Sequence, residues 1–235
     1  MVESDELIRS VGVNIQEKAA LIWSVADTLR GPYKPHEYGL VILPMTVIKR
    51  FHDCLLPTHD AVQEAAKKYQ NFAVKDGFLR EASGYPFYNT SRFTFETLKA
   101  DPENIEENFK DYLNGFSDNV QDILARMKFA DQVERLSDPD APLLYQVIKD
   151  FCSPKADMSP DKIKAVDMGY IFENLIQRFS ESYDEDAGAH FTSRDIVYLM
   201  TDLLIAAAPH VFDGDHIVKT VYDQTMGTSQ MLGCT

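Results

Sequence analysis

The chain has 235 residues, 45% of them hydrophobic and 11% aromatic, which is too much apolar material for a disordered protein and enough for one or two domains. Its 23 basic and 37 acidic residues give a net charge of −14, so we do not expect it to hold duplex DNA well by itself; a charge that only keeps the surface soluble is the simpler alternative. The acidic first residues are no secretion signal, the apolar runs are far shorter than the roughly 18 residues of a membrane span, and the scattered cysteines indicate neither disulfides nor zinc, so we expect a cytoplasmic protein with reduced thiols and no membrane segment.

Helical patterns dominate the start of the chain. Apolar residues recur at helical spacing from Ile15 to Arg30, and Gly31-Pro32 supplies a stop, so an amphipathic helix is predicted there. A second helix is predicted over 37–56. It is apolar all round and is therefore expected to be buried, and Pro44 either kinks it or marks its true start.

Shorter helical patterns fill the middle of the chain. A polar-faced helix is predicted over 59–72, followed by a loop with little regular structure over 75–90, where Gly, Pro and Tyr are frequent. Further helices are predicted over 93–99, 105–115, 119–129, 143–151 and 162–180. Up to Ser180 the sequence shows no convincing strand alternation and no internal repeat, so this part is expected to be a set of packed helices.

The sequence changes character around Tyr183, where acidic and small residues precede another helical pattern. A helix is predicted over 195–208, with Ile196, Met200, Leu203 and Ala207 on one face. Thr192 and Ser193 can cap its first turn, and the proline after it ends it.

A β-branched run over 216–222 predicts a strand, followed by a loop that contains Asp223 and Gly227. One strand cannot bury both of its faces, so its sheet is expected to be missing or supplied by residues beyond this chain. Doubly wound α/β folds present backbone N–H groups to nucleotide-like ligands in such a loop. Many ordinary turns also contain Asp and Gly, and on this pattern alone an ordinary turn is the more frequent explanation.

Three sequence blocks resemble, in order and spacing, the methylation subunits of type I restriction-modification systems. They are MGYIFENLIQRFSE, GAHFTSRDIVYLMTDLL and VYDQTMGTSQML, and upstream helices such as LVILPMTVIKRFHD also look like that family's N-terminal domain. The resemblance covers nearly the whole chain. It implies a mainly α chain, with an N-terminal helical bundle domain over 1–160. The beginning of an α/β Rossmann-like class I methyltransferase domain follows over 161–235, truncated just after its first S-adenosylmethionine motif.

The family pattern implies a pocket for S-adenosylmethionine as cofactor. The cofactor-binding residues it implies are Gly188, Ala189, His190, Phe191, Thr192, Ser193, Asp223, Gly227, Thr228, Ser229 and Gln230. Asp223 can attract the cofactor's ammonium group, and Gly227 lets the backbone approach closely. Ser193 and Gln224 stand where the family usually has proline, and 229–230 replace two glycines. We therefore expect a loop that is altered in shape and still binds cofactor, rather than one that has lost cofactor binding.

The implied reaction is methyl transfer from S-adenosylmethionine to the exocyclic amine of adenine in DNA, at a sequence set by a separate subunit. The acceptor motif of such enzymes, Asn/Asp-Pro-Pro followed by an aromatic residue, does not occur here. Residues 85–89 resemble it only superficially, because they lack the double proline and precede the cofactor blocks, so they are interpreted as loop. No catalytic residue is therefore expected in this chain, which should be inactive alone. The family implies a DNA-specificity subunit, a second methylation subunit and a restriction subunit as partners, with DNA bound through the complex.

Two other classes of protein remain as alternatives. A non-enzymatic helical module would bind a partner in a restriction complex without holding cofactor. Independently of that choice, Phe191 could also be a core aromatic and Thr192 a simple helix cap, and each could serve both roles. A nicotinamide-dependent enzyme is disfavoured because no Gly-x-Gly-x-x-Gly follows the predicted strand. The histidines form no ligand pair at helical spacing, so no metal site is expected.

Overall fold

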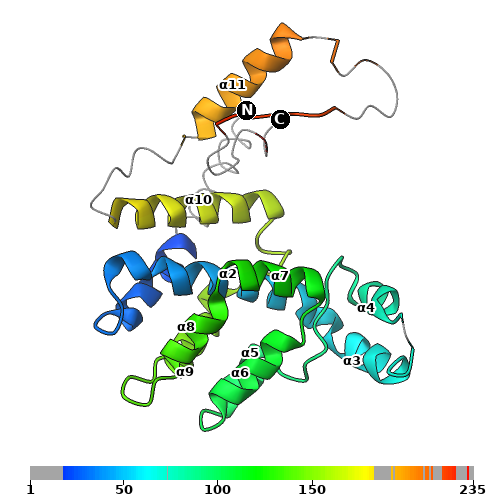
Figure 1. The fold of residues 1–235 in the computed structure, drawn as a ribbon, viewed down its shortest axis with the longest axis vertical. Helices are drawn as coiled ribbons and strands as arrows, with labels where there is room; N and C mark the ends of the chain where they lie inside the picture. The colour runs from blue at the N-terminus through cyan, green and yellow to red at the C-terminus, as the bar shows by residue number, and fades with distance from the viewer. Residues whose placement is uncertain are drawn as a thin grey trace. The chain divides into compact units, whose positions relative to one another are not determined.

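The computed structural model describes residues 18–72, 74–182, 192, 194–208, 210–211, 213, 219–225 and 232. They belong to two compact units, Met1–Ser182 and Tyr183–Thr235. Helices make up nearly all of the regular structure in both (Figure 1). Within the described ranges, β-type pairing is limited to two isolated bridges, Arg30 with Tyr33 and Asn89 with Phe116. The predicted mainly α fold class is therefore confirmed.

The helices of the first unit follow one another through short turns. In chain order they are residues 18–29, α2 (Gly39–Leu55), α3 (His59–Lys68), α4 (Asp76–Ser83), α5 (Phe95–Ala100), α6 (Ile105–Asn114), α7 (Asp118–Arg126), α8 (Phe129–Leu136), α9 (Leu144–Phe151) and α10 (Ala165–Ser182), with 3-10 turns η1 (Pro35–Glu37), η2 (Leu56–Thr58) and η3 (Pro154–Ala156). The predicted first helix is confirmed over 18–29, and its residues 15–17 lie outside the described ones. Gly31 ends it with a φ of 107°, which L side chains rarely adopt.

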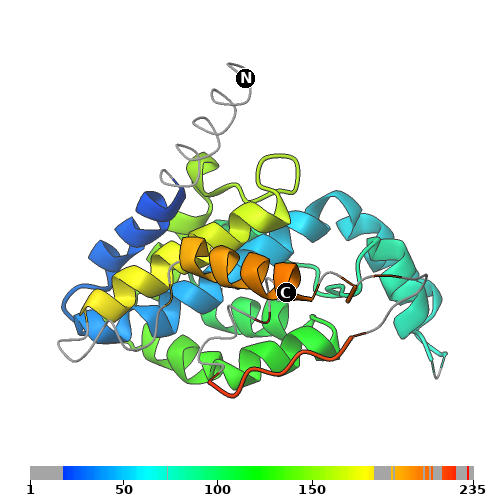
Figure 2. The ribbon, with the colours of Figure 1, turned by 90° about the horizontal axis from the view of Figure 1, so that it is seen from above.

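α2 is buried along its length, as its uninterrupted apolar sequence predicts. Val41, Ile42, Met45 and Ile48 are all fully buried, and burial is worth about 1.5–3 kcal/mol for each such side chain. α8 and α10 pack against α2 (Figure 2). Pro44 lies inside the helix, which already begins at Gly39, so the expectation that Pro44 marks the true start is wrong. Its missing N–H removes one helical hydrogen bond.

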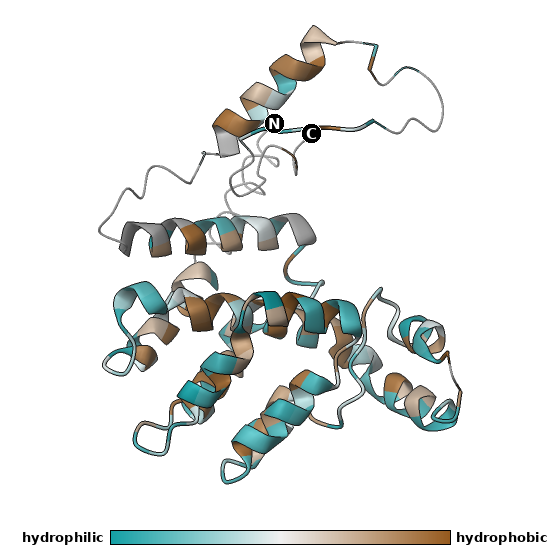
Figure 3. Cartoon of the chain, viewed as in Figure 1, coloured by the Kyte–Doolittle hydropathy of each residue, from teal (hydrophilic) through white to brown (hydrophobic). Residues whose placement is uncertain are grey.

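Aromatic side chains fill the space among α5, α6, α8 and α9. Phe95, Phe109, Phe129 and Phe151 are each at most 2% exposed. α5 packs on α6 and α9, and the rings of Phe109 and Phe129 meet edge to face at 6.3 Å. The ribbons of these helices carry both hydrophilic and hydrophobic residues (Figure 3). These helices thus form an amphipathic shell around one hydrophobic core.

The predicted loop over 75–90 is wrong in its first half, where Asp76–Ser83 forms α4. α4 packs on α3, with Leu79 fully buried and Phe78 stacked on Tyr69 at 4.3 Å between ring centroids. Gly84 ends the helix in a left-handed conformation. A helix of eight residues is marginal by itself, so packing against α3 rather than local propensity stabilises it.

The predicted helix over 119–129 is interrupted. α7 ends at Arg126, and α8 begins at Phe129 after Lys128, whose φ of 51° breaks the helix. α8 continues the helical pattern beyond the predicted end, because Phe129, Val133 and Leu136 recur at helical spacing and are all buried. The other predicted helices are confirmed to within about one turn.

The described helix of the second unit, α11 (Arg194–Ala207), carries a largely exposed apolar surface. Ile196, Leu199 and Leu203 are 51%, 59% and 61% exposed, whereas Val197 is buried. Much of α11 is correspondingly hydrophobic in Figure 3. The predicted helix over 195–208 is confirmed.

The strand predicted over 216–222 is not formed at 219–222, the described part of that range. Val221 and Tyr222 are 53% and 85% exposed there. A strand needs a neighbouring strand to pair its N–H and C=O groups, and no such neighbour is present among the described residues. The β-branched sequence is thus a strand pattern without a sheet.

Candidate functional site

Most of the predicted cofactor residues lie outside the described residues. They are Gly188, Ala189, His190, Phe191, Ser193, Gly227, Thr228, Ser229 and Gln230. Thr192 and Asp223, one from each predicted segment, are described, and both belong to the second unit. The pocket as a whole stays a prediction.

Asp223 stabilises a small turn on the predicted cofactor loop. Its Oδ1 accepts hydrogen bonds from the backbone N–H of Thr225, at 2.9 Å, and from the Thr225 hydroxyl, at 3.2 Å. This arrangement is an Asx turn, which fixes the direction of the carboxylate. The Asp223 side chain is half-buried, so it can still meet a ligand from solvent. A carboxylate held in this way suits an ammonium or hydroxyl group.

Thr192 lies two residues before the first residue of α11 and is exposed. Its hydroxyl can both donate and accept a hydrogen bond. An oriented carboxylate and an exposed hydroxyl match the ammonium and ribose hydroxyl groups of S-adenosylmethionine in chemical type. The described members of the predicted set therefore fit that cofactor, and the predicted capping role of Thr192 stays a prediction.

His52 is a core residue rather than an acid or base. Its ring packs 4.8 Å from the ring of Phe95, and its Nδ1 lies 3.3 Å from the Tyr112 hydroxyl. Burial lowers the pKa of His52 to about 3, so the ring stays neutral at physiological pH. Within the described ranges, no group of three His, Cys, Asp or Glu side chains is placed to hold a metal ion.

Charged side chains on α2 hold the segment that leads into α10. Lys49 and Asp53 form a buried ion pair at 2.5 Å, and the other oxygen of Asp53 accepts a hydrogen bond from the backbone N–H of Met158 at 2.7 Å. Burial raises the pKa of Asp53, and Lys49 opposes that rise. Arg50 donates to the carbonyl oxygens of Met158 and Ile163, the latter at 2.9 Å. The sequence gives no signal for the bonds from α2 to the 158–163 segment, because their partners lie more than 100 residues apart.

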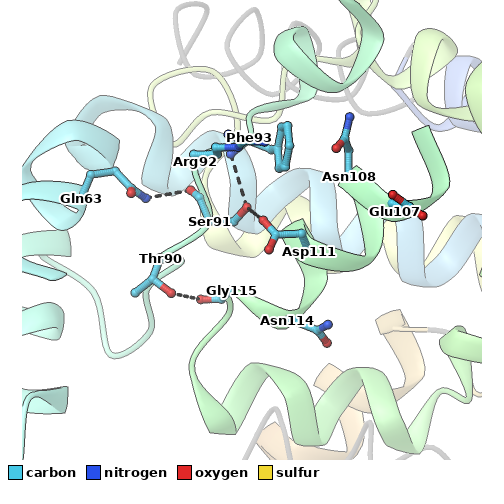
Figure 4. Close-up of a pocket in the computed structure, with 10 residues that line it drawn as sticks. All are labelled: Gln63, Thr90, Ser91, Arg92, Phe93, Glu107, Asn108, Asp111, Asn114 and Gly115. Atoms are coloured by element: carbon cyan, nitrogen blue, oxygen red, sulfur yellow. Dashed lines mark hydrogen bonds between the residues drawn. The ribbon is translucent and has the colours of Figure 1, made fainter. Parts of the chain in front are cut away.

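The first unit also contains an open polar pocket of about 580 Å³ (Figure 4). Ser91 lies at its centre: its carbonyl accepts a hydrogen bond from Gln63 at 2.7 Å, and its hydroxyl donates to Asp111 at 2.6 Å. Gly115 allows a close approach, because a Cβ there would lie 2.6 Å from the backbone nitrogen of Ser91. The guanidinium of Arg92 lies on the ring of Phe93, 4.7 Å from its centre.

The chemistry of this pocket is that of a mixed polar surface. The carboxylates of Glu107 and Asp111 and the guanidinium of Arg92 offer both signs of charge. Sequence reasoning missed the pocket because its residues come from α3, the 90–93 loop and α6, and none of these segments carries a recognisable motif. No helix in the described part is long and apolar enough to cross a membrane.

Comparison with known families gives two matches. Residues 18–151 match the family model described as the HsdM N-terminal domain. Residues 164–235 match the family model described as N-6 DNA Methylase. The comparison with curated proteins found no match to the chain. The two family matches divide the chain between residues 151 and 164, whereas its two compact units divide after Ser182.

Proposed function

Because this chain belongs to the HsdM N-terminal domain family and carries the N-terminal part of a type I restriction-modification methylation subunit, we propose that it serves the methylation of adenine in DNA. The methyl donor is S-adenosylmethionine, and a separate specificity subunit sets the target sequence. The domain boundary after residue 160 belongs to this proposal. So does the expectation that the 235-residue chain is inactive alone, because it lacks the acceptor motif.

The observation that carries the proposal is the order of the two family matches on one chain. A helical domain family is followed directly by an N-6 DNA methylase family, which supports a methyltransferase subunit of a restriction-modification system. A helical docking module alone would not need the second match. The geometry adds a turn with an oriented carboxylate where the family resemblance expects the cofactor loop.

S-adenosylmethionine would supply the electrophilic methyl group. In this chain, Asp223 would attract the ammonium group of the cofactor, with the Asx turn to Thr225 keeping the carboxylate in one direction. Thr192 would add a hydroxyl contact from the segment before α11. The two segments would therefore orient the cofactor, and the acceptor amine would be held by residues not found in this chain.

The partners that fit this function are a DNA-specificity subunit, a second methylation subunit and a restriction subunit in the cytoplasm. The net charge of −14 supports this arrangement, because the complex needs positive surface from another chain to hold DNA phosphates. The helical unit would contact the partners and help to enclose the DNA.

Cofactor binding tests the proposal. Isothermal titration of the full-length subunit with S-adenosylmethionine should give saturable binding, and Asp223→Asn should weaken it about tenfold, as loss of a charge-assisted hydrogen bond does. Asp213→Asn is the matched control, because Asp213 lies in the same unit, is exposed and pairs with His210 at 2.6 Å. Binding that is absent at millimolar cofactor, with partner subunits still bound tightly, would instead support a non-enzymatic docking module.

A further inference from the structure

An exposed aromatic cluster lies where α3 and α4 meet. Its rings belong to Tyr69, Phe72 and Phe78, and we call it the aromatic platform. Tyr69 and Phe78 stack at 4.3 Å with an interplanar angle of 14°, and Phe72 stands edge-on to both, at 5.4 and 6.2 Å. Phe72 and Phe78 are 55% and 40% exposed, and the nearby Val74 is 77% exposed. Rings that hold one another in place while remaining in water form a preformed binding surface.

Lysines flank the aromatic platform. Lys67, Lys68 and Lys75 are all exposed, and none forms an ion pair with another described residue. The ammonium group of Lys68 lies 5.1 Å from the centre of the Tyr69 ring. Figure 1 and Figure 2 both place α3 and α4 side by side at one edge of the first unit, where a ligand can reach them.

The local charge at the aromatic platform opposes that of the whole chain. Asp76, the acidic residue at the start of α4, is paired with Arg80 at 2.9 Å, so the 67–80 segment, which contains all three rings, keeps three lysines without an ion pair to a described residue; Glu64 and Glu81 lie just outside this segment. The chain as a whole has a net charge of −14. At physiological salt, charges more than about 8 Å away are largely screened, so the charges of the 67–80 segment act on a ligand at the platform more strongly than the acidic residues in the rest of the chain.

We propose that the aromatic platform and its lysines bind a short stretch of unpaired nucleic acid. Bases would stack on the exposed faces and edges of Phe72 and Phe78, and the phosphates between them would lie against Lys67, Lys68 and Lys75. This pairing of aromatic rings with cations is how proteins hold single strands without reading sequence. A protein partner fits less well, because lysine is depleted in the buried centre of protein interfaces. Duplex DNA fits less well because its bases are stacked on one another.

This inference goes beyond the proposed methyl transfer, because it depends on the surface of the first unit alone. It uses neither the cofactor loop nor a specificity subunit. Three phosphate contacts also predict a distinct salt dependence: affinity for a single strand should fall about 20-fold between roughly 50 and 200 mM salt.

Fluorescence anisotropy with a labelled oligothymidylate of about ten nucleotides tests the proposal on the 235-residue chain. Phe72→Leu, which keeps apolar bulk but removes the ring, should weaken binding about fivefold or more, and Phe72→Trp should restore it. The platform triple variant is Lys67→Gln, Lys68→Gln and Lys75→Gln. Its matched control, with the same loss of charge on other exposed lysines that form no ion pair with a described residue, is Lys34→Gln, Lys149→Gln and Lys164→Gln. The platform triple should lose most of the salt dependence, and the control should change affinity less than about twofold.

Several results would overturn the proposal. Absence of binding at about 50 mM salt is one, and unchanged binding by Phe72→Leu is another. Equal weakening by the two triple variants would show a nonspecific charge effect. Equal competition by a glutamate-rich peptide would indicate an acidic protein partner, and equal affinity for a duplex of the same length would exclude stacking. Circular dichroism of each variant should keep the wild-type helical spectrum, since every substituted side chain is exposed. Failure here leaves the methyl-transfer proposal standing, because cofactor titration tests that separately.

Discussion

The buried ion pair on α2 allows a quantitative test of what holds the segment before α10. Asp53 is 5% exposed and Lys49 is 8% exposed, and Asp53 also accepts a hydrogen bond from the backbone N–H of Met158. Asp53→Leu removes the carboxylate but leaves the Lys49 ammonium group buried. Breaking a buried pair in this way costs about 3–5 kcal/mol, and the unpaired N–H of Met158 adds about 1–3 kcal/mol.

The double substitution Lys49→Met with Asp53→Leu should be less destabilising than Asp53→Leu alone. It replaces both charges by apolar side chains of similar volume, which is often neutral or stabilising for the pair itself. The unpaired N–H of Met158 then remains as the main loss, about 1–3 kcal/mol. The double variant should therefore recover about 3–5 kcal/mol relative to Asp53→Leu, because the cost of the unpaired N–H is the same in both variants.

Urea denaturation followed by circular dichroism measures these free energies of unfolding. Lys49→Met alone completes the double-mutant cycle. A double variant that is as unstable as the sum of the two single variants would refute the reasoning, because it would mean that the two charges stabilise the fold independently. A difference in the urea dependence, rather than in the midpoint, would point to a changed unfolded state.

Three further predictions concern single sites. Gly115→Ala should destabilise the first unit by about 1–3 kcal/mol, measured by thermal denaturation, because the added methyl group would meet neighbouring backbone. Gly77→Ala, which has open space around it in a helix, should stabilise the unit by up to about 1 kcal/mol in the same measurement. The Arg135 side chain holds the pKa of Glu37 at about 2, below its ordinary 4.5, so this contact stabilises the fold fully above about pH 4.5 and loses its effect as pH falls toward 2. Arg135→Gln should therefore make the melting temperature less dependent on pH between 4.5 and 2, and an unchanged pH dependence would contradict the prediction. Phe179→Ala should lower the free energy of unfolding by about 3–5 kcal/mol, because a buried ring is lost. It should also shift the fluorescence of the chain's single tryptophan, whose ring lies 4.9 Å from that of Phe179. A shift in fluorescence without loss of stability would show that the core does not need α10.

Sequence patterns were sufficient for the helices whose stability comes from their own amphipathic spacing. α2 and α9 show why, since an apolar run or a repeat of buried residues predicts both the helix and its burial. They were insufficient for α4, where Leu79 and the Phe78 ring depend on α3. They were also insufficient at Lys128, because a non-glycine residue with positive φ leaves no mark in the periodicity.

The candidate sites divide in the same way. The loop around Asp223 could be proposed because its residues are close in sequence and resemble a known block. The aromatic platform could not, because Tyr69 and Phe78 stack only after two helices pack together. The hold of Arg50 on the 158–163 segment was equally hidden, since one side chain bonds to backbone atoms, which carry no residue identity.

The hydrogen bonds of Arg50 connect α2 to the segment that precedes α10. The Arg50 guanidinium donates hydrogen bonds to the carbonyl oxygens of both Met158 and Ile163, and these bonds restrict the segment that precedes α10. α10 packs on α2 and belongs to the same compact unit, although the N-6 DNA Methylase match already begins at residue 164. The first helix of that match therefore belongs structurally to the helical unit, so a substitution that destabilises α2 is expected to destabilise this helix as well.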